Sequence, residues 1–280
     1  MTEILNGKIL AKTIRDKAKI RVEAMETPPG LAVILIGENP ASQLYVRLKE
    51  VAAKEVGIYV ERHECPADIS TKDAIAKVQE LNERNDINGI LVQLPLPGGQ
   101  DTDAIISAIM PIKDIDGFHT ENRRLLLAST PNLVPPTALS LMRLIQATRI
   151  PLRGKIAVIL GNSQIFAEPI IELLRDAGVA ATFVPKDTEG LSAITRAADI
   201  LIVAVGIANF VTADMVKPSA VVLDVGANKS GDKTIGDVAA DVIGQAGFIS
   251  PVPGGVGPLT VAYLLLNVIK AMELQERLRG

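Results

Sequence analysis

The stretch LAVILIGENPASQLYVRLKEVAAKEVG, residues 31–57, decides the fold class of this chain. Its first six residues form a continuous apolar run, which is typical of a strand buried on both faces. Gly37 and Pro40 end that run, residues 41–56 then repeat apolar side chains at helical spacing, and Gly57 follows as a C-cap. A strand, a turn and a helix in this order predict one unit of a parallel α/β sheet.

The same alternation continues along the rest of the chain. It predicts strands at residues 58–64, 89–93, 155–160, 179–184, 199–205 and 220–225, and helices at residues 72–84, 164–177, 191–198 and 261–279. Between Asp101 and Pro136 the pattern loosens, because several prolines interrupt it, and we place a hinge there. We therefore predict an α/β protein of two domains with a cleft between them.

The composition is that of a globular protein of 280 residues. Apolar residues make up 48% and charged residues 22% of the chain, which excludes disordered, collagen-like and coiled-coil proteins. The formal net charge is −3 and neither half of the chain is basic. A nucleic acid partner is therefore not expected.

Few residues are available for metal or redox chemistry. The one cysteine, Cys65, cannot form an internal disulfide, which favours a reducing compartment such as the cytoplasm. Only two histidines, His63 and His119, accompany it without a cluster of carboxylates, so no metal site is predicted. The N-terminus lacks the apolar core of a signal peptide. The most apolar runs, residues 200–208 and 259–266, are shorter than the roughly 20 residues of a membrane span, so no membrane association is expected.

Two candidate functional positions lie on the first predicted sheet. Tyr45 and Lys49 share one face of a predicted helix, and a partly desolvated lysine beside a phenol has the lowered proton affinity that a general acid/base needs. That spacing is more often an ordinary amphipathic surface, since lysine usually extends to water. Gln93 ends the strand at residues 89–93, where α/β sheets place their ligands, although an amide there is more often a loop hydrogen-bond partner.

Two loops also carry candidate residues. Asp114 and Asp116 flank Ile115 beside Gly117 and could orient a ligand with N–H donors, although the spacing alone favours an Asx-type turn. The loop PVPGGVGP at residues 251–258 has three glycines and three prolines in eight residues. A structural turn needs far fewer special residues, so exposed amides that surround a ligand are expected there.

A phosphate-binding turn is predicted at Gly161-Asn162-Ser163, which follows a buried strand and opens a helix. The complete G-x-G-x-x-G fingerprint is absent, but the strand–turn–helix–strand context is the one that this motif requires. At the end of the following strand, Lys186 would suit the 2′-phosphate of an adenosine ribose and Asp187 would suit a 2′-hydroxyl.

Together these features resemble, in order and spacing, the bifunctional methylenetetrahydrofolate dehydrogenase/methenyltetrahydrofolate cyclohydrolase (FolD) family, over nearly the whole chain. The matching stretches are ENPASQLYVRLKE (38–50), GILVQLPLP (89–97), KDIDGFH (113–119), ADILIVAVG (198–206), VKPSAVVLDVGAN (216–228) and ISPVPGGVGPLT (249–260). The resemblance implies oxidation of 5,10-methylenetetrahydrofolate with NADP⁺, with NAD⁺ possible, and hydrolysis of the methenyl product to 10-formyltetrahydrofolate. These reactions belong to one-carbon metabolism and purine biosynthesis.

The resemblance also implies roles for individual residues. Lys49 becomes the catalytic acid/base, Gln93 holds it and helps to set its protonation state, Tyr45 positions the folate rings, and Asp116 accepts hydrogen bonds from the pterin. The residues expected to touch the cofactor are Gly161, Asn162, Ser163, Lys186 and Ala227. Those expected to line the folate site, close to the nicotinamide, are Pro253, Gly254, Gly255 and Pro258.

The same resemblance implies a division into domains. Residues 1–135, completed by the C-terminal helix at 261–280, would form the catalytic folate domain, and residues 136–260 a Rossmann-like NAD(P)-binding domain. The family is typically dimeric through the second domain, so a cytoplasmic homodimer that binds tetrahydrofolate derivatives is expected.

Departures from the family pattern fall on the cofactor side. Asn162 replaces the arginine of Gly-Arg-Ser, Ala167 replaces a glycine, Pro135-Pro136-Thr137-Ala138 replaces Pro-Cys-Thr-Pro, and Asn122-Arg123-Arg124 replaces Asn-x-Gly. Lys186 can replace the lost arginine, which favours NADP.

Two alternatives to the bifunctional enzyme stay open. One is a cyclohydrolase whose dehydrogenase activity is lost or switched to NAD, and the other is a non-catalytic folate-binding protein. A short-chain dehydrogenase with Tyr45 and Lys49 as its Y-x-x-x-K is excluded, because its glycine fingerprint would have to precede the tyrosine.

Overall fold

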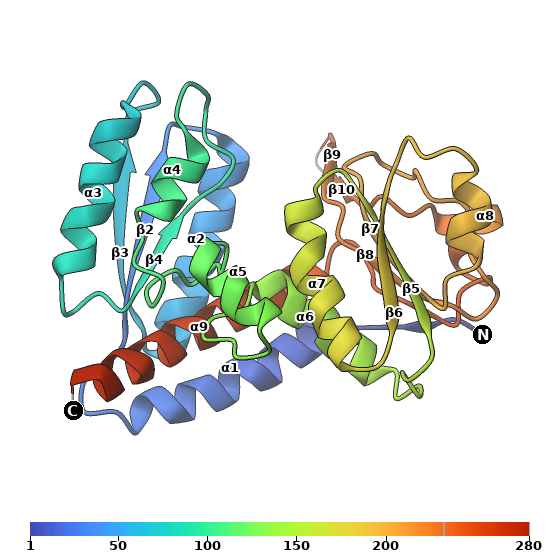
Figure 1. Cartoon of the computed structure of the whole chain (residues 1–280), viewed down its shortest axis with the longest axis horizontal. Coiled ribbons are helices and arrows are strands. Elements are labelled where there is room, and N and C mark those ends of the chain that lie inside the picture. Colours follow the sequence, from blue (N-terminus) through green and yellow to red (C-terminus); the bar gives the residue numbers. More distant parts are fainter. Residues whose placement is uncertain (232, 280) are drawn as a thin grey trace. The chain divides into compact units, whose positions relative to one another are not determined.

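The computed structural model describes residues 1–231 and 233–279, and these residues form two compact α/β units (Figure 1). Unit 1 comprises Met1–Ala11 and Thr137–Thr260, and unit 2 comprises Lys12–Pro136 and Val261–Gly280. The main sheet of each unit is parallel, which confirms the predicted α/β class with a Rossmann-like domain, here unit 1.

Unit 2 is built on a three-stranded sheet with the order β3-β2-β4. The central strand β2 (Gly30–Ile36) is buried along its whole length, as its continuous apolar run predicts. The strand β4 (Gly89–Val92) is also fully buried, whereas β3 (Tyr59–Cys65) is an edge strand and is only partly buried. All three strands run in the same direction, so their carboxyl ends meet at one edge of the sheet.

The side chains of β2 alternate between two helical layers. Leu31, Val33 and Leu35 pack in one core cluster with α1, α2 and α9, and the intervening residues pack in another with α3 and α4. Unit 2 is therefore a three-layer α/β/α arrangement, with buried side chains on both faces of the sheet. The helices of these layers are α1 (Gly7–Glu23), α2 (Pro40–Val56), α3 (Thr71–Glu83), α4 (Thr102–Ser107) and α9 (Val256–Arg279).

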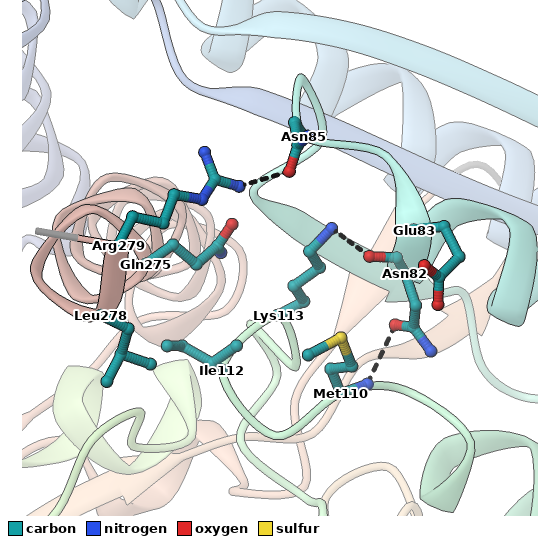
Figure 2. Close-up of a pocket in the computed structure, with 9 residues that line it drawn as sticks. All are labelled: Asn82, Glu83, Asn85, Met110, Ile112, Lys113, Gln275, Leu278 and Arg279. Atoms are coloured by element: carbon teal, nitrogen blue, oxygen red, sulfur yellow. Dashed lines mark hydrogen bonds between the residues drawn. The ribbon is translucent and has the colours of Figure 1, made fainter.

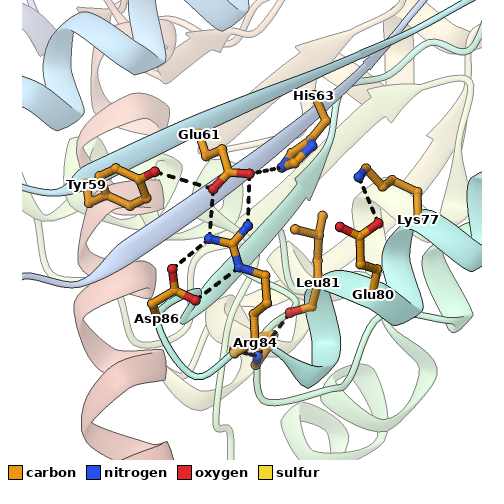
Figure 3. A network of polar contacts seen from close by, with 9 residues as sticks. Tyr59, Glu61, His63, Lys77, Glu80, Leu81, Arg84 and Asp86 are labelled. Atoms are coloured by element: carbon orange, nitrogen blue, oxygen red, sulfur yellow. Dashed lines mark hydrogen bonds and ion pairs between the residues drawn. The ribbon is translucent and has the colours of Figure 1, made fainter.

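A polar network ties the edge strand β3 to the loop after α3 (Figure 3). Arg84 Nη1 donates to Glu61 Oε1 over 2.9 Å and Arg84 Nη2 to Asp86 Oδ2 over 2.6 Å. His63 Nε2 lies 2.8 Å from the same Glu61 oxygen. The guanidinium lowers the pKa of both carboxyls, so they stay ionised and give the exposed strand a charged side that resists pairing with another chain.

Both ends of α2 are capped, which fixes the register of the residues that it carries. Asn39 Oδ1 accepts hydrogen bonds from the amides of Ala41 and Ser42, and Pro40 occupies the first turn. Gly57 ends the helix in the left-handed region at φ 92°. The predicted helix 41–56 is therefore confirmed.

Unit 1 is built on a six-stranded parallel sheet with the order β1-β11-β8-β7-β5-β6. From β5 the chain moves outward through α7 to β6 and then returns through α8 to β7 on the other side of β5. The topological switch point therefore lies between the carboxyl ends of β5 and β7, where sheets of this type bind their ligands. The strands are β1 (Glu3–Ile4), β5 (Ile156–Gly161), β6 (Ala180–Pro185), β7 (Ile200–Ala204), β8 (Val221–Asp224) and β11 (Phe248–Ile249).

The remaining elements of unit 1 cover or extend this sheet. The helix α7 packs on β5 and β6, and β9 and β10 pair with each other in an antiparallel ribbon. The elements are α6 (Pro136–Ala147), α7 (Gln164–Asp176), α8 (Leu191–Arg196), the strands β9 (Asn228–Ser230) and β10 (Lys233–Ile235), and two 3₁₀ helices, η1 (Ala213–Met215) and η2 (Ala240–Val242).

The N-terminus departs from the predicted domain division. The sequence places residues 1–11 in the folate domain, which corresponds to unit 2, whereas the structure groups them with the Rossmann-like unit 1. The reason is the parallel pairing of β1 with β11, in which the Glu3 amide donates to Gly247 O over 2.9 Å and the Leu5 amide to Ile249 O over 2.8 Å. A strand of two residues leaves no periodicity to detect.

Residues 101–136, predicted as a loose hinge, contain two short helices. The first, α4, is N-capped by Asp101, whose side chain accepts from the Ala104 amide, and α5 (Thr120–Leu127) is N-capped by His119, whose Nδ1 accepts from the Glu121 amide. The last helix also begins earlier than predicted, at Val256 instead of 261. Pro258 lies in its first turn, where no intrahelical N–H is needed.

The helix α9 is long and apolar enough, by length and composition, to cross a membrane. Of its most apolar window, 56% is buried inside the protein, and Leu264, Leu265 and Val268 belong to the unit 2 core. Its buried Asn267 donates through Nδ2 to Ile115 O over 2.7 Å and to Val134 O over 2.9 Å. These packed and hydrogen-bonded side chains identify α9 as a core helix.

Replacing Asn267 with alanine should destabilise unit 2 by about 2–4 kcal/mol, because two buried carbonyls lose their donor. Differential scanning calorimetry should show a melting temperature that is lower by roughly 5–10 °C. Glu276→Ala, an exposed change on the same helix, is the matched control and should leave the transition in place. An Asn267→Ala transition equal to that of the control would contradict this account.

Candidate active site

Lys49 and Gln93 meet at the carboxyl edge of the unit 2 sheet. Gln93 directly follows β4 and is 8% exposed. Its backbone N–H donates to Ile34 O over 2.9 Å, which continues the strand pairing. Lys49, on α2, donates from Nζ to Gln93 Oε1 over 2.9 Å. Gln93 Nε2 in turn donates to Leu94 O over 2.6 Å, which orients the amide so that its oxygen accepts from the lysine.

Burial and a nearby carboxylate act in opposite directions on the Lys49 amine. Desolvation lowers the pKa of Lys49, because the charged form loses water that a neutral amide only partly replaces. The Asp116 carboxylate raises the pKa of Lys49, and this smaller effect only partly offsets burial. Burial likewise raises the pKa of Asp116, against the lysine's opposing charge. The two groups therefore form a desolvated pair in which proton affinities approach each other.

The loop that carries Asp116 is held by the residue two positions before it. Asp114 is buried, and its carboxylate accepts from the amides of Gly117 and His119, over 3.2 and 2.8 Å, and from Asn122 Nδ2 over 3.0 Å. Burial raises the pKa of Asp114 to about 6. Asp114 thus closes the turn of this loop through its side chain, and Asp116 lies close enough for its charge to act on Lys49.

Lys113 anchors the start of the same loop. Its buried Nζ donates to the carbonyls of Asn82 and Arg84, each over 2.7 Å, at the carboxyl end of α3. Desolvation lowers the pKa of Lys113 to about 8. A pocket of about 310 Å³ opens beside it, towards Arg279 (Figure 2). Arg279 donates to Asn85 Oδ1 there over 2.6 Å.

Tyr45 lies one helical turn before Lys49 on α2, and its side chain is 43% exposed. Its phenol ring is therefore open to a ligand from solvent, next to the lysine. The structure thus brings four of the predicted catalytic residues to one edge of unit 2: Tyr45, Lys49, Gln93 and Asp116.

The predicted phosphate-binding turn lies at the switch point of unit 1. Gly161 ends β5, and a Cβ on it would stand 3.1 Å from Ala204 O on β7, so glycine keeps the two strands close. Asn162 Nδ2 donates to Val205 O over 2.6 Å, which bridges the ends of these strands. Ser163 caps α7, with its Oγ accepting from the Phe166 amide over 3.2 Å.

Lys186 follows β6, which is the neighbour of β5, and Gly161 lies opposite Pro185 in the register. Lys186 Nζ pairs with Asp187 Oδ2 over 2.9 Å. Ala227 is exposed and lies beyond the end of β8, between two residues that are hydrogen-bonded to buried carboxylates. All five predicted cofactor residues therefore lie at the carboxyl edge of one sheet.

The proline- and glycine-rich loop has a structural reason for its glycines. A Cβ on Gly7 would stand 1.8 Å from Gly255 O, and a Cβ on Gly255 would stand 2.7 Å from Pro251 O. Gly254 is in the left-handed region at φ 112°, and the Lys8 amide donates to its carbonyl over 3.2 Å. The loop is packed against the start of α1, while Pro253 is exposed and Pro258 is partly exposed.

Unit 1 contains two buried carboxylates that were not predicted from the sequence. Asp224 is 4% exposed and Asp237 is 0% exposed, and both lie at the carboxyl edge of the sheet. The signal that could have found them is an aspartate beside a glycine at a strand end, as in Asp224-Val-Gly and Gly236-Asp237. Within residues 1–231 and 233–279, no group of three or more His, Cys, Asp or Glu side chains is arranged to hold a metal ion.

Comparisons with known proteins agree with this geometry. Residues 5–116 match the family model of the tetrahydrofolate dehydrogenase/cyclohydrolase catalytic domain, and residues 135–276 match that of its NAD(P)-binding domain. The bifunctional protein FolD of Burkholderia pseudomallei is 46% identical over 275 residues, which cover 96% of each chain.

Solved structures extend the match to the fold. The bifunctional FolD enzyme of Campylobacter jejuni has a TM-score of 0.94 at 39% identity, over 98% of this chain and 100% of that one. The Trypanosoma brucei enzyme, solved with an NADP cofactor and an inhibitor, has a TM-score of 0.94 at 34% identity over 99% of both chains. This chain therefore belongs to the tetrahydrofolate dehydrogenase/cyclohydrolase family.

Proposed function

We propose that this chain oxidises 5,10-methylenetetrahydrofolate with NADP⁺ and hydrolyses the resulting 5,10-methenyltetrahydrofolate to 10-formyltetrahydrofolate. The observation that carries this proposal is the desolvated Lys49 amine, held 2.9 Å from Gln93 and facing Asp116. Two matched domain models of the family and a relative that is 46% identical support both activities. Folate chemistry is assigned to unit 2 and cofactor binding to unit 1.

Hydrolysis requires a base that is neutral near physiological pH. Burial lowers the pKa of Lys49, which favours the neutral amine that takes a proton from the water attacking the methenyl carbon. The ammonium returns that proton to N5 as the carbon–N5 bond breaks, and the hydroxyl proton passes to the neutral amine, and from it to solvent, as the formyl carbonyl forms. Gln93 keeps the amine in place throughout without adding a charge that would fix its protonation state.

Folate binding is assigned to groups around this amine. Tyr45, exposed one turn away, offers a ring face for the pteridine, and the Asp116 carboxylate accepts from pterin N–H groups. By resemblance to the family, we also assign the loop residues Pro253, Gly254, Gly255 and Pro258 to folate binding. Packing on α1 already explains the two glycines among them.

The unit 1 residues fit a dinucleotide. The exposed start of α7 at Ser163 offers backbone N–H groups to a pyrophosphate, and Ala227 is exposed beyond the end of β8. Asn162 lacks the charge for a 2′-phosphate and is engaged with Val205 O, so Lys186 is the cation assigned to that phosphate. NADP⁺, when bound, supplies the hydride acceptor. The chain's own task is alignment, since nitrogen lone pairs of the folate support the cation that remains.

The wider assignment follows the same family. We infer a cytoplasmic homodimer that associates through unit 1 and binds neither nucleic acid nor membrane, which a net charge of −3 and one free thiol at Cys65 support.

The two activities can be tested separately. Purified protein with 5,10-methylenetetrahydrofolate should reduce NADP⁺, seen as nicotinamide absorbance, and should also open added methenyltetrahydrofolate. Silence with both NADP⁺ and NAD⁺, alongside intact hydrolysis, would replace this proposal with the cyclohydrolase-only alternative. Neither activity, with folate still bound, would favour the non-catalytic alternative.

Lys49→Met should lower the rate constant of methenyl hydrolysis by about 10²–10⁴-fold, since the base is lost and methionine keeps a similar shape. Lys54→Met, on an exposed face of the same helix, should retain the wild-type rate. Circular dichroism should show both variants folded. Hydrolysis near the wild-type rate in Lys49→Met would refute the assignment.

Asp116→Asn should move the acidic limb of the kcat–pH profile for hydrolysis to lower pH. The carboxylate raises the pKa of Lys49, so its removal lowers that pKa and leaves more neutral amine at any given pH. Glu50→Gln is the control, because Glu50 neighbours Lys49 in sequence but pairs with Arg62 over 3.4 Å. A limb that moves to higher pH would show that this electrostatic account is wrong.

Lys186→Gln should weaken binding of NADP⁺ about tenfold or more relative to NAD⁺, because a charge-assisted contact to the 2′-phosphate is lost. Isothermal titration calorimetry with each dinucleotide measures the ratio. Lys155→Gln, at the amino end of β5 and paired with Asp199, serves as the control. An unchanged ratio in Lys186→Gln would remove Lys186 from the site.

A further inference from the structure

Two carboxylates are buried in unit 1 without a cationic partner among the contacts of the described residues. Asp224 ends β8 and Asp237 follows β10, and they are 4% and 0% exposed. Burying a carboxylate is costly unless hydrogen-bond donors replace its water. Here the donors are backbone amides and one side-chain amide, so each carboxylate acts only as an acceptor.

Asp224 fixes the backbone that carries the second carboxylate. Its Oδ1 accepts from the amides of Gly226 over 2.9 Å and Asp237 over 3.0 Å, and its Oδ2 accepts from the Val238 amide over 3.0 Å. A Cβ on Gly236 would stand 1.9 Å from Asp224 Oδ2, so only glycine allows this approach. Asp224 thereby links the end of β8 to the chain that returns from β10.

Asp237 extends this link to the switch point. Its Oδ2 accepts from the amides of Val205 over 2.7 Å and Gly206 over 2.9 Å, directly after β7. Its Oδ1 accepts from Asn228 Nδ2 over 2.7 Å. Since Asn162 donates to Val205 O, the backbone of Val205 is held by Asp237 through its N–H and by Asn162 through its carbonyl.

The segments that Asp237 joins are the exposed chain ends beside the proposed cofactor residues. Gly206 is exposed at the end of β7, and Ala227 is exposed between Gly226, bonded to Asp224, and Asn228, bonded to Asp237. A Cβ on Gly226 would stand 2.3 Å from the Asp237 carboxyl carbon, so this packing leaves no room for adjustment. Asp237 thus joins the loop after β7 to the loop after β8, in addition to the pairing of those two strands.

We propose that Asp237 is a positioning residue for the cofactor site, which sets the backbone at Val205–Gly206 and at Ala227 against which the dinucleotide binds. The inference rests on the proposed dehydrogenase function. A carboxylate is required because three donors converge on it, and a carboxamide would present its own N–H₂ to one of them.

The test compares Asp237→Asn with a swapped double variant. In Asp237→Asn the oxygen can still accept from Val205 and Gly206, but the new amide faces Asn228 Nδ2, donor against donor. The double variant Asn228→Asp/Asp237→Asn reverses that contact and conserves the charge, and it gives up only the longer bond of 3.2 Å from Asn228 Nδ2 to Ile235 O. Asp241→Asn, an exposed aspartate on η2, is the matched control.

Calorimetric titration with NADP⁺, at a temperature where circular dichroism shows every variant folded, should give a dissociation constant raised roughly tenfold or more in Asp237→Asn. The dissociation constant of the double variant should return to within about threefold of the wild-type value. That of Asp241→Asn should equal the wild-type value. In the dehydrogenase assay, Asp237→Asn should raise the KM for NADP⁺ by a larger factor than it lowers kcat. The rate of methenyl hydrolysis in unit 2 should not fall to match.

Three results would overturn the inference. They are wild-type NADP⁺ affinity in Asp237→Asn, no recovery in the double variant, and an equal loss of hydrolysis and NADP⁺ binding, which indicates general unfolding. A wild-type protein that does not bind NADP⁺ is distinguishable from all three, since it overturns the proposed cofactor and this inference with it.

Discussion

The desolvation of the Lys49 ammonium is the constraint on which the candidate site of unit 2 is organised. Lys49 donates to Gln93, an uncharged amide, and faces Asp116 without forming a close ion pair with it. A tight carboxylate contact would stabilise the cation, and a fully apolar pocket would expel the proton. The amide satisfies the nitrogen in either protonation state, and the carboxylate at a distance moderates the effect of burial. That balance is what acid/base work by one amine requires.

This balance depends on holding Asp116 still, and distant parts of the chain do so. Lys113 caps α3, Asp114 closes its own turn, and Asn267 of α9 donates to Ile115 O, the carbonyl just before Asp116. Only one residue of this loop therefore faces the lysine, while its neighbours are fixed by the core. The C-terminal helix α9 belongs to the helical layer on one face of the sheet. It also supports the loop beside the reacting amine.

Much of this arrangement could be predicted from the sequence, and the remainder had no local signal. The continuous apolar run of β2, the spacing of α2 and the strand end at Gln93 each leave a pattern, because burial and period act on neighbouring residues. The pairing of β1 with β11 and the contact of Asp237 with Val205 join residues far apart in sequence. Their periodicity carries no trace of the partner. The glycines at 254 and 255 did leave a signal, but close packing on α1 produces the same signal as a ligand.

The two units solve opposite electrostatic problems at equivalent places, the carboxyl edges of parallel sheets. Unit 2 holds the Lys49 ammonium without a close carboxylate partner, so that its proton stays transferable. Unit 1 surrounds Asp224 and Asp237 with N–H donors, so that these carboxylates stay fixed acceptors. Burial raises the pKa of Asp224 to about 6, yet three backbone amides oppose that rise. A group meant to exchange protons is therefore left incompletely compensated, whereas a group meant to hold backbone is saturated with donors, and the donor count around a buried charge distinguishes the two roles.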